Sequence, residues 1–167
     1  MYRIDTSARD SIRQPRQTQT DPSRRTLGFV ARGRSVIDYA LARRATLESL
    51  LAGGASTTDV CDADPYLLRA AKYHGAASGR RCPVCRRAEL RDVTYTFGDE
   101  LGQYSGRIKS APELEEMAGQ HGEFRVYVVE VCLDCSWNHL TTSYVLGDGV
   151  PRRPPRRRRT VEDVYGH

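Results

Sequence analysis

The sequence has few large apolar side chains and no long apolar run. Its 167 residues include one Trp, three Phe and two Met, so the core that they can build is modest. No stretch approaches the roughly 18 consecutive apolar residues of a membrane-spanning helix, and residues 1–5 begin no apolar signal sequence. We therefore expect no membrane-spanning segment, a cytoplasmic location and cysteines that stay reduced.

Lysine is almost absent, because Lys72 and Lys109 are the only lysines among 26 basic residues. The arginines favour the two ends of the chain. Residues 1–25 and 148–167 each carry a net charge of +3, whereas residues 26–147 carry −1, in agreement with the overall +5. Both ends are also poor in apolar side chains. They are therefore predicted to be disordered basic tails.

The C-terminal tail, residues 148–167, contains prolines that keep it extended and a dense run of arginines. Such a run binds polyanions without reading their sequence, and it can also bind anionic lipid. A tail that only keeps the protein soluble is the alternative. The candidate polyanion-binding residues are Arg152, Arg153, Arg156, Arg157, Arg158 and Arg159.

Four of the five cysteines form two Cys-x-x-Cys pairs, Cys82 with Cys85 and Cys132 with Cys135. Two intervening residues let both sulfurs of a tight turn face one metal ion, so the pattern predicts a structural Zn²⁺ site. Iron, a disulfide framework and a redox pair are the alternatives. Four thiolates leave no open coordination position, which argues against metal-assisted hydrolysis. The residue after each second cysteine, often Gly in such turns, is Arg or Ser here.

Four arginines flank the first cysteine pair: Arg80, Arg81, Arg86 and Arg87. They could offset the negative charge of the thiolates, or they could contact phosphates. Both roles stay open at this point, and the four residues join the candidate polyanion-binding set.

Residues 26–79 are predicted to be helical. One helix should begin at the N-cap Ser35 and end at Gly53–Gly54, with Arg43 and Arg44 on a solvated edge. A short helix should follow Thr57 or Thr58. The third has Asp64 as N-cap and Pro65 at its first position, and ends before Gly75. Residues 76–79 are expected to be a linker.

These three helices resemble a helix-turn-helix in outline, but the last one offers few groups suited to base edges. We therefore expect a helical platform. Within it, Cys61 is interpreted as a buried apolar residue and His74 as a residue of a helix end.

Residues 80–147 are predicted to form a three-stranded antiparallel zinc ribbon, which makes the fold class α+β with the helices packed beside the ribbon. The strands are expected at 92–97, 124–131 and 137–146, with 124–131 in the centre because it is apolar on both faces. Residues 98–122 form an insertion in which Ser110 and Glu113 cap a helix at 112–118. His139 is expected on the sheet surface rather than at the metal.

Two segments resemble a family of small actinobacterial proteins, mycobacterial ones included, catalogued as a domain of unknown function. They are Val60–Pro65 and Val131–Asn138. The resemblance covers about residues 26–150. It implies only the four ribbon cysteines and no activity.

The sequence favours a small adaptor that binds nucleic acid or a nucleic-acid machine, such as RNA polymerase or the ribosome, without catalysis. A protein–protein or anionic-membrane-surface adaptor is the alternative. An enzyme ranks last, because Cys61, His74 and His139 have no supporting constellation. No small-molecule substrate is inferred.

Overall fold

A computed structural model describes residues 33–151. One antiparallel sheet organises this part of the chain, with strand order β1-β6-β5-β3-β2 and β4 paired to the outer side of β3. Its strands are β1 (Arg34–Asp38), β2 (Ala76–Arg81), β3 (Glu89–Phe97), β4 (Arg107–Ile108), β5 (Phe124–Val131) and β6 (Asn138–Leu146). The α+β class is confirmed, but the sheet has six strands rather than the expected three.

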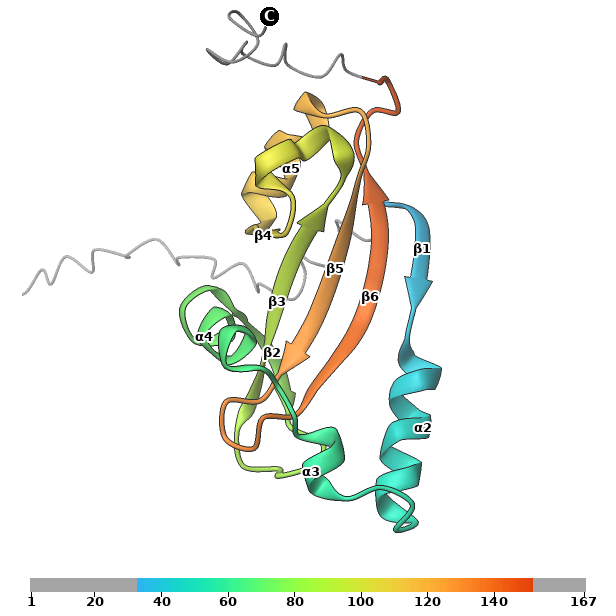
Figure 1. Cartoon of the computed structure of the whole chain (residues 1–167), viewed down its shortest axis with the longest axis vertical. Helices are drawn as coiled ribbons and strands as arrows, with labels where there is room; N and C mark the ends of the chain where they lie inside the picture. The colour runs from blue at the N-terminus through green and yellow to red at the C-terminus, as the bar shows by residue number, and fades with distance from the viewer. Residues whose placement is uncertain (1–32, 152–167) are drawn as a thin grey trace, which may run out of the picture.

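The helices gather at the two ends of this sheet, as Figure 1 shows. They are α2 (Ala40–Leu51), α3 (Thr57–Val60), α4 (Pro65–His74) and α5 (Ala111–Gln120), with a 3₁₀ helix η1 at Asp99–Tyr104. None of the helices in residues 33–151 is long and apolar enough to cross a bilayer. The predicted tails, 1–25 and 148–167, lie outside the described residues except for 148–151.

Strand β5 lies in the middle of the sheet, as predicted from its apolar residues on both faces. Successive side chains of a strand point to opposite faces. Val126 and Val128 pack with Leu114 and Met117 of α5, and Val131 packs with Ala71 of α4 and its neighbours. Val126 and Val128 therefore point to one face of β5 and Val131 to the other, so the two helices pack against different parts of the sheet.

The first predicted helix starts in the wrong place. Residues 34–38 form β1, which pairs with β6, and Ser35 has a positive φ of 50° rather than a capping role. The β-branched pair Val36–Ile37 suits a strand. Helix α2 begins only at Ala40, whose backbone N–H donates to Asp38 Oδ1 at 2.8 Å.

The expected linker at 76–79 is also wrong, because these residues belong to β2. The pairing runs from Ala76 opposite Asp92 to Arg81 opposite Glu89, with an irregularity between Ala77 and Arg81. Gly79 lies in that irregularity with φ 72°, a conformation that glycine adopts without steric cost. Strand β2 thus leads straight into the first cysteine turn.

Two helix predictions are confirmed. Helix α4 has Asp64 as its N-cap, with the side chain accepting a hydrogen bond from Tyr66 N, and Pro65 in the first turn. Helix α5 has the expected capping box, in which Glu113 Oε2 accepts hydrogen bonds from Ser110 N at 2.8 Å and Ser110 Oγ at 2.7 Å.

The cap of α5 makes the stability of the protein depend on pH. The backbone N–H of Ser110, its hydroxyl and Lys109 lower the pKa of Glu113 from 4.5 to about 2. A lowered carboxyl pKa contributes stability that is complete above pH 4.5 and is lost as the pH falls toward 2. Since the Glu113 side chain is half exposed, Glu113→Gln should lower the free energy of unfolding at pH 7 by at most about 1 kcal/mol.

Denaturant unfolding of wild type and Glu113→Gln between pH 7 and pH 3 measures this effect. The difference between the two proteins should shrink as the pH falls below 4.5. Glu115→Gln, on the exposed side of the same helix, is the matched control and should change little at any pH. A Glu113→Gln difference that is constant over the whole range would contradict the assigned cap.

Candidate metal centre

The two Cys-x-x-Cys turns lie at the same end of the sheet. The first joins β2 to β3 and the second joins β5 to β6. Because β3 pairs with β5 and Arg91 is opposite Val131, the two hairpins end side by side. Cysteines about 50 residues apart in the chain therefore meet.

The two turns share one backbone hydrogen-bond pattern. Arg86 N donates to Cys82 O at 3.0 Å, and Ser136 N donates to Cys132 O at 3.1 Å. Each turn is closed at its base, where Cys82 N donates to Ala88 O at 2.9 Å and Cys132 N donates to Trp137 O at 2.8 Å. The two turns are therefore closely similar, although the first closes on a residue one position further along the chain than the second does.

Both turns also place a residue other than glycine in the left-handed region. Arg86 has φ 59° and Ser136 has φ 65°, at the two positions where glycine is common in such turns. A side chain in this conformation costs roughly 1–2 kcal/mol. Arg86 and Ser136 both adopt this conformation despite its cost, so the turns keep their geometry without glycine.

The four sulfurs converge. The ligand atoms of Cys82, Cys85, Cys132 and Cys135 all lie within 4.8 Å of one another, and the Sγ atoms of Cys82 and Cys135 and those of Cys85 and Cys132 are each 3.6 Å apart. A disulfide bond would hold its sulfurs about 2.05 Å apart, and all four cysteines are free. The four residues that the sequence singled out therefore form a cluster that could hold a metal ion.

The thiols of the cluster have unequal acidity. Burial raises the pKa of Cys135 to about 12. Burial also acts to raise the pKa of Cys85, but hydrogen bonds from the backbone N–H groups of Ala88 and Arg87 and from the Cys132 and Cys82 side chains together lower it to about 6. Since a metal binds thiolates, its binding to such a cluster must release protons.

Cys61 and His139 carry side chains that could bind a metal, and both lie near the cluster but outside it. Cys61 packs against the apolar residues around the cysteines, but it is half-buried rather than buried as predicted. His139 stacks on Trp137 with ring centroids 5.9 Å apart, and its Nδ1 lies 2.7 Å from Leu140 O. Neither belongs to the group of converging ligand atoms.

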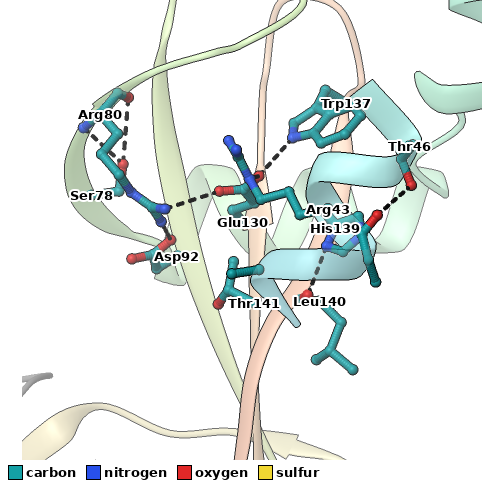
Figure 2. Close-up of polar contacts among 12 residues, drawn as sticks. Arg43, Thr46, Ser78, Arg80, Asp92, Glu130, Trp137, His139, Leu140 and Thr141 are labelled. Atoms are coloured by element: carbon teal, nitrogen blue, oxygen red, sulfur yellow. Dashed lines mark hydrogen bonds and ion pairs between the residues drawn. The ribbon is translucent and has the colours of Figure 1, made fainter. Parts of the chain in front are cut away.

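A buried carboxylate next to the cysteines was missed by the sequence analysis. Glu130 is fully buried, and its Oε1 accepts hydrogen bonds from Arg43 Nε at 2.6 Å and from Trp137 Nε1 at 2.9 Å. Its Oε2 makes no hydrogen bond but lies 3.3 Å from Arg80 Nη1, an ion-pair distance. Figure 2 shows Glu130 between the two arginines.

This network, Glu130 with Arg43, Arg80, Asp92 and Trp137, joins distant segments. Arg80 Nη2 also lies 3.3 Å from Asp92 Oδ1; burial raises the pKa of Asp92, and Arg80 opposes that shift. Arg43 lies on α2, and its side chain is only 25% exposed and bonds the buried Glu130, so the prediction that Arg43 lies on a solvated edge is wrong. The network fastens α2 to the sheet beside the second cysteine turn.

The candidate polyanion-binding arginines separate into groups. Arg80, Arg81, Arg86 and Arg87 are all exposed, but Arg80 pairs with the carboxylates of Glu130 and Asp92. Arg81 Nη1 is 3.5 Å from Arg86 O. The six arginines of residues 152–159 lie outside the described residues.

The fold and the cysteine cluster define an α+β protein with a four-cysteine candidate metal site. Residues 30–161 match the model of a family of unknown function, DUF5318. The chain belongs to this family, and the resemblance to mycobacterial proteins is confirmed.

Two of the relatives come from mycobacteria. Uncharacterized protein Rv0049 of Mycobacterium tuberculosis and uncharacterized protein Mb0050 of Mycobacterium bovis are each 52% identical to this chain over 120 residues. The match covers 72% of this chain and 88% of each relative. No solved structure matches the chain.

Proposed function

We propose that the protein is a small cytoplasmic adaptor in which a zinc ribbon with a structural Zn²⁺ supports binding of nucleic acid or of a nucleic-acid machine such as RNA polymerase or the ribosome. The proposal assigns it no catalytic step. Four cysteine ligands would fill the tetrahedral coordination of zinc and leave no position for a reacting water.

The spacing of the sulfurs fits zinc. A tetrahedral site with zinc–sulfur bonds of about 2.3 Å has sulfurs about 3.8 Å apart, close to the 3.6 Å of the two short pairs. The backbone N–H groups around Cys85 favour its thiolate form. Cys82, Cys85, Cys132 and Cys135 would hold the ion, which would tie the two hairpins together.

The observation that carries the binding proposal is the contrast among the arginines of the first turn. Arg80 is neutralised by Glu130 and Asp92. For Arg81, Arg86 and Arg87, no ion pair with a carboxylate is found within residues 33–151. Three exposed arginines, Arg81 at the end of β2 and Arg86 and Arg87 in the turn that follows, suit phosphate groups, which arginine binds in a bidentate manner.

We expect the triple variant Arg81→Gln, Arg86→Gln, Arg87→Gln to bind nucleic acid more weakly and with less dependence on salt. Three lost phosphate contacts on a single strand reduce the slope of log K against log salt by about 2. Fluorescence anisotropy with a labelled 20-nucleotide oligo(U), between 50 and 300 mM salt, measures this slope. An unchanged slope and affinity would contradict the role of these three residues.

A double variant with Arg44→Gln and Arg107→Gln, exposed arginines on other elements, serves as the control and should keep the wild-type slope. The same titration with vesicles of phosphatidylcholine and 30% phosphatidylserine separates the membrane-surface alternative. Retention on these vesicles but not on RNA at matched salt would favour lipid over nucleic acid.

A further inference from the structure

The outward side of α4 carries two exposed tyrosines interleaved with basic residues. Tyr66 and Tyr73 are 76% and 68% exposed. The guanidinium carbon of Arg69 lies 5.6 Å from the centre of the Tyr66 ring, and Lys72 Nζ lies 5.5 Å from the centre of the Tyr73 ring. We call these four residues the α4 arc; Figure 1 shows α4 beside the sheet.

The opposite side of the helix explains why the arc faces solvent. Ala70 and Ala71 are buried against Val93 and Val131 of the sheet, and Leu67 and Leu68 pack against the same cluster. All the aliphatic residues of α4 are therefore used in the core. Within the described residues, Tyr66 and Tyr73 are too exposed to contribute to the packing of the core.

The composition of the arc points to the chemistry of its partner. Helix α4 contains no acidic residue, and its last turn carries Lys72 and His74. Interfaces between proteins are also rich in tyrosine and arginine, but they are depleted in lysine and have a more apolar centre. The arc contains Lys72 and exposes no aliphatic side chain. Aromatic rings beside cations instead match the needs of an unpaired nucleotide strand, whose bases stack on the rings while its phosphates meet the cations.

The spacing of the rings fits the same partner. Tyr66 and Tyr73 are seven residues apart, which places them about two turns and 10 Å apart along one side of the helix. Successive nucleotides of a strand rise by about 3.4 Å, so the two rings are separated by about three of them. A cation covers one face of each ring, which leaves the other face to a base.

We propose that the α4 arc binds single-stranded nucleic acid, with bases stacked on Tyr66 and Tyr73 and phosphates held by Arg69 and Lys72. This inference rests on the proposed function, and it specifies that the α4 arc binds unpaired rather than double-stranded nucleic acid. Stacking needs unpaired bases, so the arc prefers a single strand to a duplex.

The test uses the full chain and a labelled 12-nucleotide oligo(U), with a duplex DNA of equal length as the second probe. Tyr66→Ala with Tyr73→Ala should weaken binding of the single strand at least tenfold, since two stacked bases are lost. It should leave the salt slope and duplex binding unchanged, because no charge is removed. Tyr66→Phe with Tyr73→Phe should retain wild-type affinity.

Tyr104→Ala is the matched control, since Tyr104 is a 55% exposed tyrosine of η1, and it should bind as wild type does. Circular dichroism checks that the exposed substitutions leave the fold intact. If the double alanine variant binds the single strand normally while the Arg81, Arg86 and Arg87 variant does not, the arc proposal is overturned and the proposed function stands. If the wild-type protein binds neither probe, the arc proposal is overturned, and so is direct binding of nucleic acid in the proposed function.

Discussion

Replacing Cys85 by serine is expected to unfold residues 80–147 and to release the helices that pack against the cysteine turns. Metal binding contributes roughly 10–16 kcal/mol in isolated zinc-finger peptides, which is comparable to the whole net stability of a domain. Trp137, Leu90 and Val60 are buried together with Cys82 and Cys132. Loss of the proposed ion therefore exposes the core that joins α3 to the sheet.

Circular dichroism and thermal unfolding measure this change, and chelation of the wild-type protein should reproduce it. Cys61→Ser is the matched control, because Cys61 adjoins the cluster without belonging to it. It should keep the fold and lose only the small free energy of a half-buried thiol. A Cys85→Ser protein with wild-type melting behaviour would contradict a structural role for the cluster.

The second large effect is expected from Arg43→Met, which should lower the free energy of unfolding by about 3 kcal/mol. The substitution removes the charge-assisted hydrogen bond of 2.6 Å to Glu130. Glu130 is fully buried, and breaking one partner of a buried ion pair leaves a charge that water does not reach. Arg80 remains, but its side chain is 49% exposed and lies 3.3 Å from the other carboxylate oxygen, so it compensates only in part.

Two further variants make this prediction specific. Arg44→Met changes the adjacent, exposed arginine of the same helix and should shift stability by no more than about 0.5 kcal/mol. Adding Glu130→Met to Arg43→Met removes the stranded charge and should recover part of the loss, as a double-mutant cycle in urea reveals. Equal effects of Arg43→Met and Arg44→Met would contradict the buried network.

The cysteine cluster could be predicted because its signal is local. Two Cys-x-x-Cys pairs need only short turns to present their sulfurs, and the turns formed even with Arg86 and Ser136 in left-handed conformations. The N-cap Asp64 and the capping box of α5 are equally local, and both helices lie where the sequence placed them, within a few residues.

Strand β1 could not be predicted because its partner, β6, is distant in sequence, and β2 could not because its own residues give no strand signal. The segment Ala76–Arg81 contains residues that disfavour strands, such as Ala77 and Gly79. It is extended because it leads into the turn that begins at Cys82 and because its backbone pairs with β3. Serine is a common helix N-cap, which is why a helix was predicted to begin at Ser35. Residues 34–38 instead form a strand, because residues such as Ile37 pair with β6, in this case with Ser143.

Glu130 left a signal that the sequence analysis did not use. It falls on the same face of β5 as Phe124, Val126 and Val128, and a lone carboxylate among buried valines needs a cationic partner. The sequence could not name that partner, because Arg43 lies 87 residues away on a helix whose start had been misplaced.

The central claim is that four sulfurs hold one zinc ion, and elemental analysis of protein purified from reducing cytosol tests it most directly. The account predicts one zinc per wild-type chain, one in Cys61→Ser and a substoichiometric amount in Cys85→Ser. Wild-type protein that is folded and contains no stoichiometric metal would contradict it.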